Sequence, residues 1–131
     1  MEIIDDELLD SVTELASKGP RLRMNHNFHK SLDAKAQRLL NAMEPGTELP
    51  IHRHLNTDET YILLRGSLQV LFYNEKGELI GTESLNPLEG KFGVNIPAGQ
   101  WHSIKVLEPG TVIFEVKDGP YTLLGEEDVL K

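Results

Sequence analysis

The 131-residue chain has no cysteine, so disulfide bonds and thiolate metal ligands are excluded. It also has little positive charge, because 13 lysine and arginine residues stand against 21 aspartate and glutamate residues, for a net charge of −8. This balance argues against binding to nucleic acid or to an anionic membrane. No apolar run approaches the roughly 18 residues of a membrane span, and residues 1–6 do not resemble a secretion signal. We therefore expect a cytoplasmic protein.

The rest of the composition is that of an ordinary globular domain, with 39% hydrophobic and 26% charged residues. A chain of this length builds one domain around one core. We divide it into an N-terminal helix packed on a barrel (residues 1–20), the β-barrel itself (21–121) and a C-terminal tail (122–131). The polar segment 21–33 is predicted to be irregular, and residues 125–131 are predicted to be loose and solvated.

One helix is predicted near the start of the chain. Asp5 or Asp6 can cap its first turn, and the pair Gly19-Pro20 ends it. The apolar residues between these signals fall on one helical face: Leu8, Leu9, Val12, Leu15 and Ala16. We expect this face to pack on the barrel, and a partner-binding helix is the alternative.

After Asp33 the chain is divided by turn residues, among them Pro45-Gly46, Asn86-Pro87 and Pro109-Gly110. The segments between the turns are short and rich in strand-forming residues. They predict eight strands, at residues 35–44, 49–55, 59–65, 67–74, 78–85, 92–96, 101–107 and 111–117. Strands of this number and spacing favour a mainly β fold, either a double-sheet jelly roll or a small barrel.

Two motifs carry the residues with metal-binding chemistry. The first, residues 46–66, reads G-x5-H-x-H-x4-E-x6-G, and the second, residues 97–102, reads P-x-G-x2-H. His52 and His54 are two residues apart, so in a strand they share a face with Cα atoms about 6.6 Å apart. Glu59 follows a turn-prone stretch and can return on the neighbouring strand, and His102 follows a Pro/Gly turn.

Three imidazoles and one carboxylate suit a borderline divalent transition metal. The sequence therefore predicts that His52, His54, Glu59 and His102 hold one metal ion. Ligand type does not select among Zn, Fe, Mn and Ni.

Both motifs resemble the two motifs of the cupin superfamily, which implies a metal-containing, RmlC-like jelly-roll barrel. Cupins often carry asparagine four residues after the last histidine, where this chain has Val106. Because that asparagine is not a ligand, the departure leaves the metal site intact. Residues 21–29, 37–40 and 112–121 extend the likeness, and the chain from about residue 8 to 121 resembles the WbuC family of cupin-fold metalloproteins. This resemblance implies a connection with surface-polysaccharide (O-antigen or capsule) biosynthesis, and it implies no particular reaction.

Other residues are candidates for a pocket beside the metal. Strand alternation predicts that Tyr61, and Arg65 at the end of the same strand, point inward with Glu59. Glu115 interrupts an apolar run, and a buried carboxylate needs a partner, for which Arg38 or a ligand histidine is available. Tyr61 and Glu115 are therefore candidate catalytic residues. The alternatives are a core tyrosine and an exposed glutamate on an edge strand.

A polar segment before the first predicted strand supplies further candidates. The predicted substrate-pocket residues are Arg21, Arg23, Asn25 and His29 of this segment, together with Arg38 of the strand that follows. The basic ones among them would suit a phosphorylated or carboxylate substrate. An ordinary surface loop is the alternative for this segment.

Three functions fit these observations. The first is an enzyme acting on a sugar, nucleotide-sugar or similar small polar metabolite, such as an isomerase or epimerase, with the metal as Lewis acid. The second is an iron- or manganese-dependent dioxygenase, and the third is a non-catalytic module that binds a metal and a metabolite. A cupin barrel alone does not decide among them. We expect a homodimer by analogy with other cupins.

Overall fold

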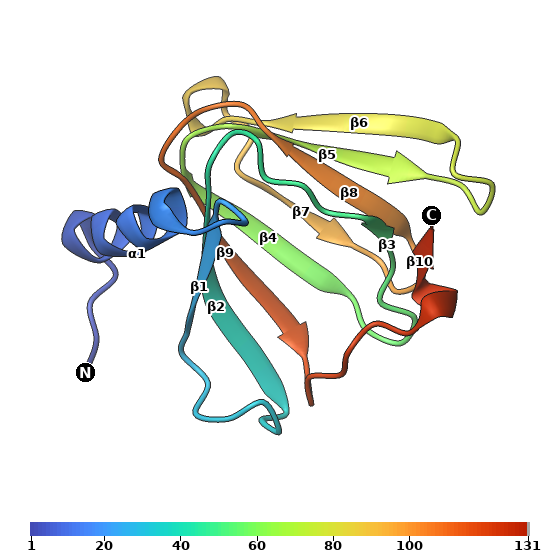
Figure 1. Ribbon diagram of the computed structural model, residues 1–131, viewed down its shortest axis with the longest axis horizontal. Coiled ribbons are helices and arrows are strands. Elements are labelled where there is room, and N and C mark those ends of the chain that lie inside the picture. The colour runs from blue at the N-terminus through green and yellow to red at the C-terminus, as the bar shows by residue number, and fades with distance from the viewer. Residues whose placement is uncertain (131) are drawn as a thin grey trace.

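The computed structural model describes residues 1–130, which form two antiparallel five-stranded sheets and one α-helix (Figure 1). One sheet has the order β1 (Arg23–Asn27), β2 (Ala36–Met43), β9 (Thr111–Asp118), β4 (Glu59–Arg65) and β7 (Gly93–Ile96). The other has the order β10 (Val129–Leu130), β3 (Ile51–His52), β8 (Trp101–Val106), β5 (Leu68–Tyr73) and β6 (Leu79–Leu85). Short 3-10 helices span Pro87–Glu89 (η1) and Glu126–Asp128 (η2). The predicted mainly β jelly roll is confirmed.

The sheets enclose one core, and the helix α1 (Asp6–Lys18) completes a second core on the outside of the barrel. Tyr61, Leu63 and Ile113 are among the residues between the sheets. Leu40 and Val112 face the other way and pack with α1. β2 is therefore buried on both faces over most of its length, and the helix packs against β1 and β2 (Figure 1).

The helix begins as predicted, because the Asp5 side chain accepts a hydrogen bond from the Leu8 amide at 3.0 Å. Leu9, Val12 and Ala16 are buried. The prediction that Leu15 shares their face was wrong, since its side chain is 55% exposed. At about 100° per residue, Leu15 lies at the margin of the apolar stripe. Within residues 1–130, no helix is long and apolar enough to cross a membrane.

Two segments predicted to be irregular are ordered strands. Segment 21–33 contains β1, which pairs with β2 with Asn25 opposite Asn41. Its sequence, RMNHN, has a single apolar residue, Met24, and therefore shows no hydrophobic alternation. The end of the chain forms η2 and β10, with Val129 paired to His52, and Arg53 Nε donates to Asp128 Oδ1 at 2.9 Å. Lys131, the last residue of the predicted tail, lies outside the described residues.

The backbone geometry explains why the last residue of the first motif is a glycine. Gly66 has a φ of +87°, and a Cβ there would lie 2.2 Å from the Thr111 side-chain oxygen. No other residue fits this turn between β4 and β5 without displacing β9. The strand predicted at 49–55 is much shorter, because only Ile51–His52 pairs regularly. Residues 53–55 instead form the loop that carries His54.

The two faces of α1 can be compared by a matched pair of variants. Leu9→Ala should lower the free energy of unfolding by about 2–4 kcal/mol, because it leaves a cavity in the core under the helix. Leu15→Ala should change it by less than about 0.5 kcal/mol, because that side chain is largely in water. Urea denaturation of both variants measures the difference. Equal losses would mean that the helix packs through another face.

Candidate metal centre

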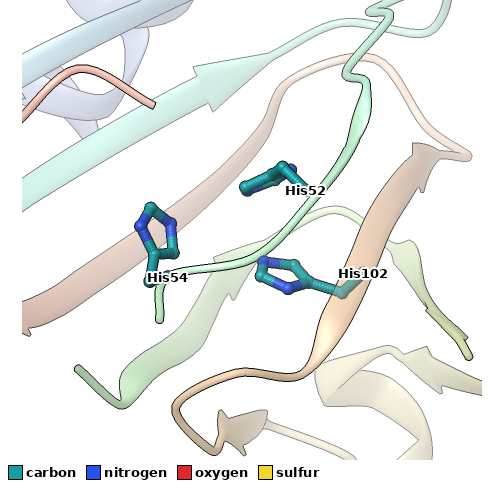
Figure 2. A group of neighbouring side chains, drawn as sticks. All are labelled: His52, His54 and His102. Carbon is teal, nitrogen blue, oxygen red and sulfur yellow. The ribbon is translucent and has the colours of Figure 1, made fainter. Parts of the chain in front are cut away.

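Three histidines from two neighbouring strands meet on the inner side of the barrel. His52 ends β3 and lies opposite His102 of β8, and His54 follows in the loop after β3. Figure 2 shows their rings around a common space, and one nitrogen of each lies within 4.8 Å of the others. The spacing predicted from the two motifs therefore does bring the three imidazoles together.

Backbone hydrogen bonds set the tautomers of two of these histidines. Nδ1 of His52 lies 2.9 Å from the Pro50 carbonyl oxygen, and Nδ1 of His102 lies 2.9 Å from the Gln100 carbonyl oxygen. A carbonyl oxygen only accepts, so both Nδ1 atoms carry a proton, and in the neutral ring the lone pair is on Nε2. His102 Nε2 is buried and has no hydrogen-bond partner. A buried lone pair aimed into a histidine cluster is the arrangement that a metal ion would satisfy.

Glu59 faces this cluster from the other sheet. Its Oε2 atom lies 3.4 Å from His54 Nε2 and 3.4 Å from His102 Nε2. The Tyr61 hydroxyl donates to the same oxygen at 3.1 Å. The carboxylate is thus held against two of the three histidines, and its role as the fourth ligand stays a prediction. The donor set of imidazole nitrogens and one carboxylate fits a divalent transition metal.

The protonation states in this cluster are those that metal binding requires. Burial and the neighbouring His102 lower the pKa of His52 to about 4, and burial lowers the pKa of His54. Burial by itself would raise the pKa of Glu59, but the adjacent imidazoles of His102 and His54 favour the ionised carboxylate and lower it to about 2. At neutral pH His52 and His54 are therefore neutral imidazoles and Glu59 is an ionised carboxylate, as metal binding requires.

Glu115 of β9 lies beside the cluster, opposite Tyr61 of β4. Burial, followed by the charge of Glu59, raises the pKa of Glu115 to about 8, so its carboxyl group keeps a proton at neutral pH. Its partner is Asn41, whose Nδ2 donates to Oε1 at 2.8 Å. The pairing suggested with Arg38 was wrong, because Arg38 is exposed and alternates with the inward-facing residues of β2.

A cavity of about 310 Å³ with both polar and apolar walls opens next to Glu115. It is lined by Asn25, Asn27, His29, Leu32, Gln37, Leu39, Glu115, Lys117 and Tyr121. Lys117, which lies opposite Glu59 across β9 and β4, also lines a smaller cavity of about 110 Å³ that His54 reaches. Lys117 therefore lies between the histidine cluster and the larger cavity. Sequence reasoning missed it, although strand alternation from Glu115 would have pointed to it.

The predicted pocket residues divide into groups. Asn25 and His29 line the 310 Å³ cavity, and His29 Nδ1 accepts from the Arg38 amide at 3.1 Å. Arg21 and Arg23 line other cavities, at the opposite end of β1 from His29.

Two residues of β4 behave differently from each other. Tyr61 is buried as predicted, and burial together with Glu59 raises its pKa well above the usual value, so it keeps its proton. Arg65 does not continue the inward row, because a β-bulge precedes it and its guanidinium bonds the Gly110 carbonyl and Asp10. The catalytic roles suggested for Tyr61 and Glu115 stay predictions.

Comparison with known proteins identifies a family but not an activity. The family model described as "Domain of unknown function (DUF6016)" matches residues 4–85. The chain belongs to the DUF6016 family. No curated protein matches it. The finer resemblance to the WbuC family stays a prediction.

Similarity to solved structures establishes the cupin fold. The capsular polysaccharide assembling protein CapF from Staphylococcus aureus is 18% identical over 82% of this chain and 31% of its own, with a TM-score of 0.60. KdgF from Halomonas sp. is 17% identical over 80% and 85%, with a TM-score of 0.59. The Cnp3 cupin domain of Schizosaccharomyces pombe is 14% identical over 73% and 64%, with a TM-score of 0.58. The DUF6016 chain thus spans under two thirds of the Cnp3 chain and about a third of CapF.

Removal of one ligand tests the metal centre. His54→Ala should abolish stoichiometric metal binding, because it removes one of three converging imidazoles. His26→Ala is the matched control, since His26 lies outside the cluster and pairs with Glu2. Plasma mass spectrometry of protein purified without chelators measures both. Full metal content in His54→Ala would refute the ligand assignment.

The lowered pKa of His52 predicts a pH dependence of the metal-free protein. The folded-state pKa is about 4 against an ordinary value of 6.5, so the unfolded chain binds this proton more tightly. Stability should therefore fall as the pH falls from about 6.5 towards about 4, by about 2 kcal/mol between about pH 7 and pH 4.5. In His52→Gln this part of the pH dependence should vanish. Urea denaturation at the two pH values measures it, and identical pH profiles for both proteins would contradict the prediction.

Proposed function

We propose that the protein is a metal-dependent enzyme of the cupin fold that binds a sugar, a nucleotide-sugar or a similar polyhydroxylated metabolite and catalyses a proton transfer on it. One observation carries the proposal. Glu115 and Lys117, which lie opposite Tyr61 and Glu59 on β4, also line a cavity of about 310 Å³ whose walls carry amide, imidazole, carboxyl and ammonium groups. Such walls suit a ligand with many hydroxyl groups, because each hydroxyl needs a donor and an acceptor when it leaves water.

The size of the cavity agrees with this class of ligand. Small-molecule sites usually occupy about 300–1,000 Å³, and the cavity lies at the low end of that range. The side-chain amides of Asn25 and Asn27 supply both donors and acceptors. The Tyr121 ring, with the Lys117 ammonium 5.7 Å from its centre, offers an apolar surface for a sugar ring.

The residues around the histidine cluster have different chemical roles in the proposed reaction. A divalent ion held by the histidines would polarise a carbonyl or hydroxyl oxygen of the ligand. Glu115 holds a proton in a carboxyl group that is already oriented by Asn41, and it is the candidate acid–base residue. Tyr61 keeps its proton and orients Glu59, so we assign it a positioning role. Lys117 places a positive charge where an oxyanion of the ligand would lie.

The resemblances support the substrate class. CapF is a capsular polysaccharide assembling protein by its description, and the similarity between the WbuC pattern and this chain points to surface polysaccharide as well. We therefore propose that the metabolite belongs to surface-polysaccharide biosynthesis.

The proposal is tested by a reaction screen with matched variants. Metal-loaded protein is incubated with sugars, sugar phosphates and nucleotide-sugars in D₂O, and proton NMR detects exchange or a new isomer. Wild-type protein should incorporate deuterium into one substrate, while Glu115→Ala should reduce the rate at least about 100-fold and keep its metal. Oxygen uptake with iron-loaded protein, and no exchange, would favour the dioxygenase. A ligand bound and returned unchanged would favour the binding module.

A further inference from the structure

A pair of arginines at the start of the edge strand β1, with Arg21 just before the strand and Arg23 as its first residue, is not used by the proposed chemistry. Arg21 and Arg23 flank Leu22, the only residue other than glycine with a positive φ (57°) within the part of the chain that the structure describes. The Leu22 carbonyl oxygen accepts from the Glu44 amide at 2.9 Å and from the Thr47 hydroxyl at 2.9 Å. A left-handed leucine is unfavourable and persists only where its surroundings hold it. The backbone that carries the two arginines is thus fixed.

The two guanidinium groups have no acidic partner. Between residues 1 and 130, no ion pair within 4.0 Å includes Arg21 or Arg23. Arg23 Nη1 donates instead to the Glu48 carbonyl oxygen at 3.1 Å. Burial, and then the charge of Arg21, lowers the pKa of Arg23, which means that the two positive charges repel each other. In a protein of net charge −8, two unpaired and mutually repelling arginines are a place where an anion would be stabilised.

Two cavities meet at this pair. One, of about 440 Å³, is lined by Pro20, Gly46 and Glu48 as well as by both arginines. The other, of about 280 Å³, is lined by both arginines, Met24 and Asn25. Asn25 also lines the 310 Å³ cavity next to Glu115. The three cavities therefore follow one another along β1, each sharing a lining residue with the next, and we call this row of cavities the groove. The arginines lie at one end of it, and Glu115 and Lys117 line the other end.

The length of the groove follows from strand geometry. Arg23, Asn25 and Asn27 alternate along β1 and share its inner face, opposite Met43, Asn41 and Leu39. Alternate residues of a strand are about 6.6 Å apart, so Arg23 lies about 13 Å along the strand from Asn27. A ligand that reaches both ends must carry its negative charge at about that distance from its hydroxylated end.

We propose that Arg21 and Arg23 form an anion subsite that holds the phosphate or diphosphate group of the substrate. The inference rests on the proposed function, because it assigns the other end of the same substrate to the cavity next to Glu115. Arginine fits a phosphate through paired hydrogen bonds. The length of the groove favours a substrate that carries its phosphate or diphosphate group at a distance from its hydroxylated end. It does not favour a free neutral sugar.

The test uses inorganic phosphate as the probe and metal-loaded protein. Titration followed by ³¹P NMR should show saturable binding to the wild-type protein that weakens as sodium chloride is added. The double variant Arg21→Ala/Arg23→Ala should bind phosphate at least about 10-fold more weakly. Arg21→Lys/Arg23→Lys should fall between the two, because it keeps the charge and loses the paired geometry. Lys105→Ala, which removes one exposed positive charge on β8, is the control and should bind like the wild-type protein.

Further variants separate this inference from the proposed function. His54→Ala should bind phosphate as the wild-type protein does, because the subsite does not use the metal. Phosphate binding that is lost in His54→Ala but retained in the double arginine variant would place the anion at the metal and overturn the inference. A neutral sugar turned over as efficiently as its phosphorylated form would also overturn it, while leaving the proposed function standing. Absence of saturable binding to the wild-type protein would overturn it as well.

Discussion

The hydrophobic core between the sheets and the candidate metal centre lie on the same face of the same strands. Along β4 the inward residues run from Glu59 through Tyr61 to Leu63, and along β9 from Lys117 through Glu115 to Ile113. Half of each strand therefore contributes apolar contacts that hold the sheets together, and the other half contributes the polar groups of the site. Because strand residues alternate strictly, a shift of one position in pairing would exchange both sets with the outer residues. The packing of the apolar half thus fixes the register of the polar half.

The polar half is stable only because its groups compensate one another. Glu59 is ionised beside the histidines, while Glu115 a short distance away is protonated. Two ionised carboxylates in one dry site would repel each other strongly. Asn41 and Tyr61 supply the hydrogen bonds that keep each carboxyl group in place. The site is therefore a set of fixed dipoles and charges before any ligand arrives, which is the condition for electrostatic catalysis.

Much of this could be predicted from the sequence, and the failures have physical reasons. The histidines of both motifs were found because packing alone rarely requires imidazoles at such a spacing, whereas convergence on a metal ion does. β1 was missed because an edge strand with a single apolar residue has no periodicity to detect. Leu15 was misplaced because it lies at the margin of an apolar stripe. The pairing of Asn41 with Glu115 joins residues 74 positions apart, and no local pattern determines how β2 aligns with β9.

The large sequence separation between contacting residues also affects how fast the chain folds. The contacts that assemble the site join distant segments, from the β2–β9 pair to the single register contact between His52 and His102. Long-range pairings of this kind are slow to form, because closing a long loop costs conformational entropy before the new contacts can stabilise the chain. A partly folded chain would hold scattered histidines with little affinity for an ion. Metal uptake would therefore report that the barrel has closed, and a cell would load only molecules that have finished folding.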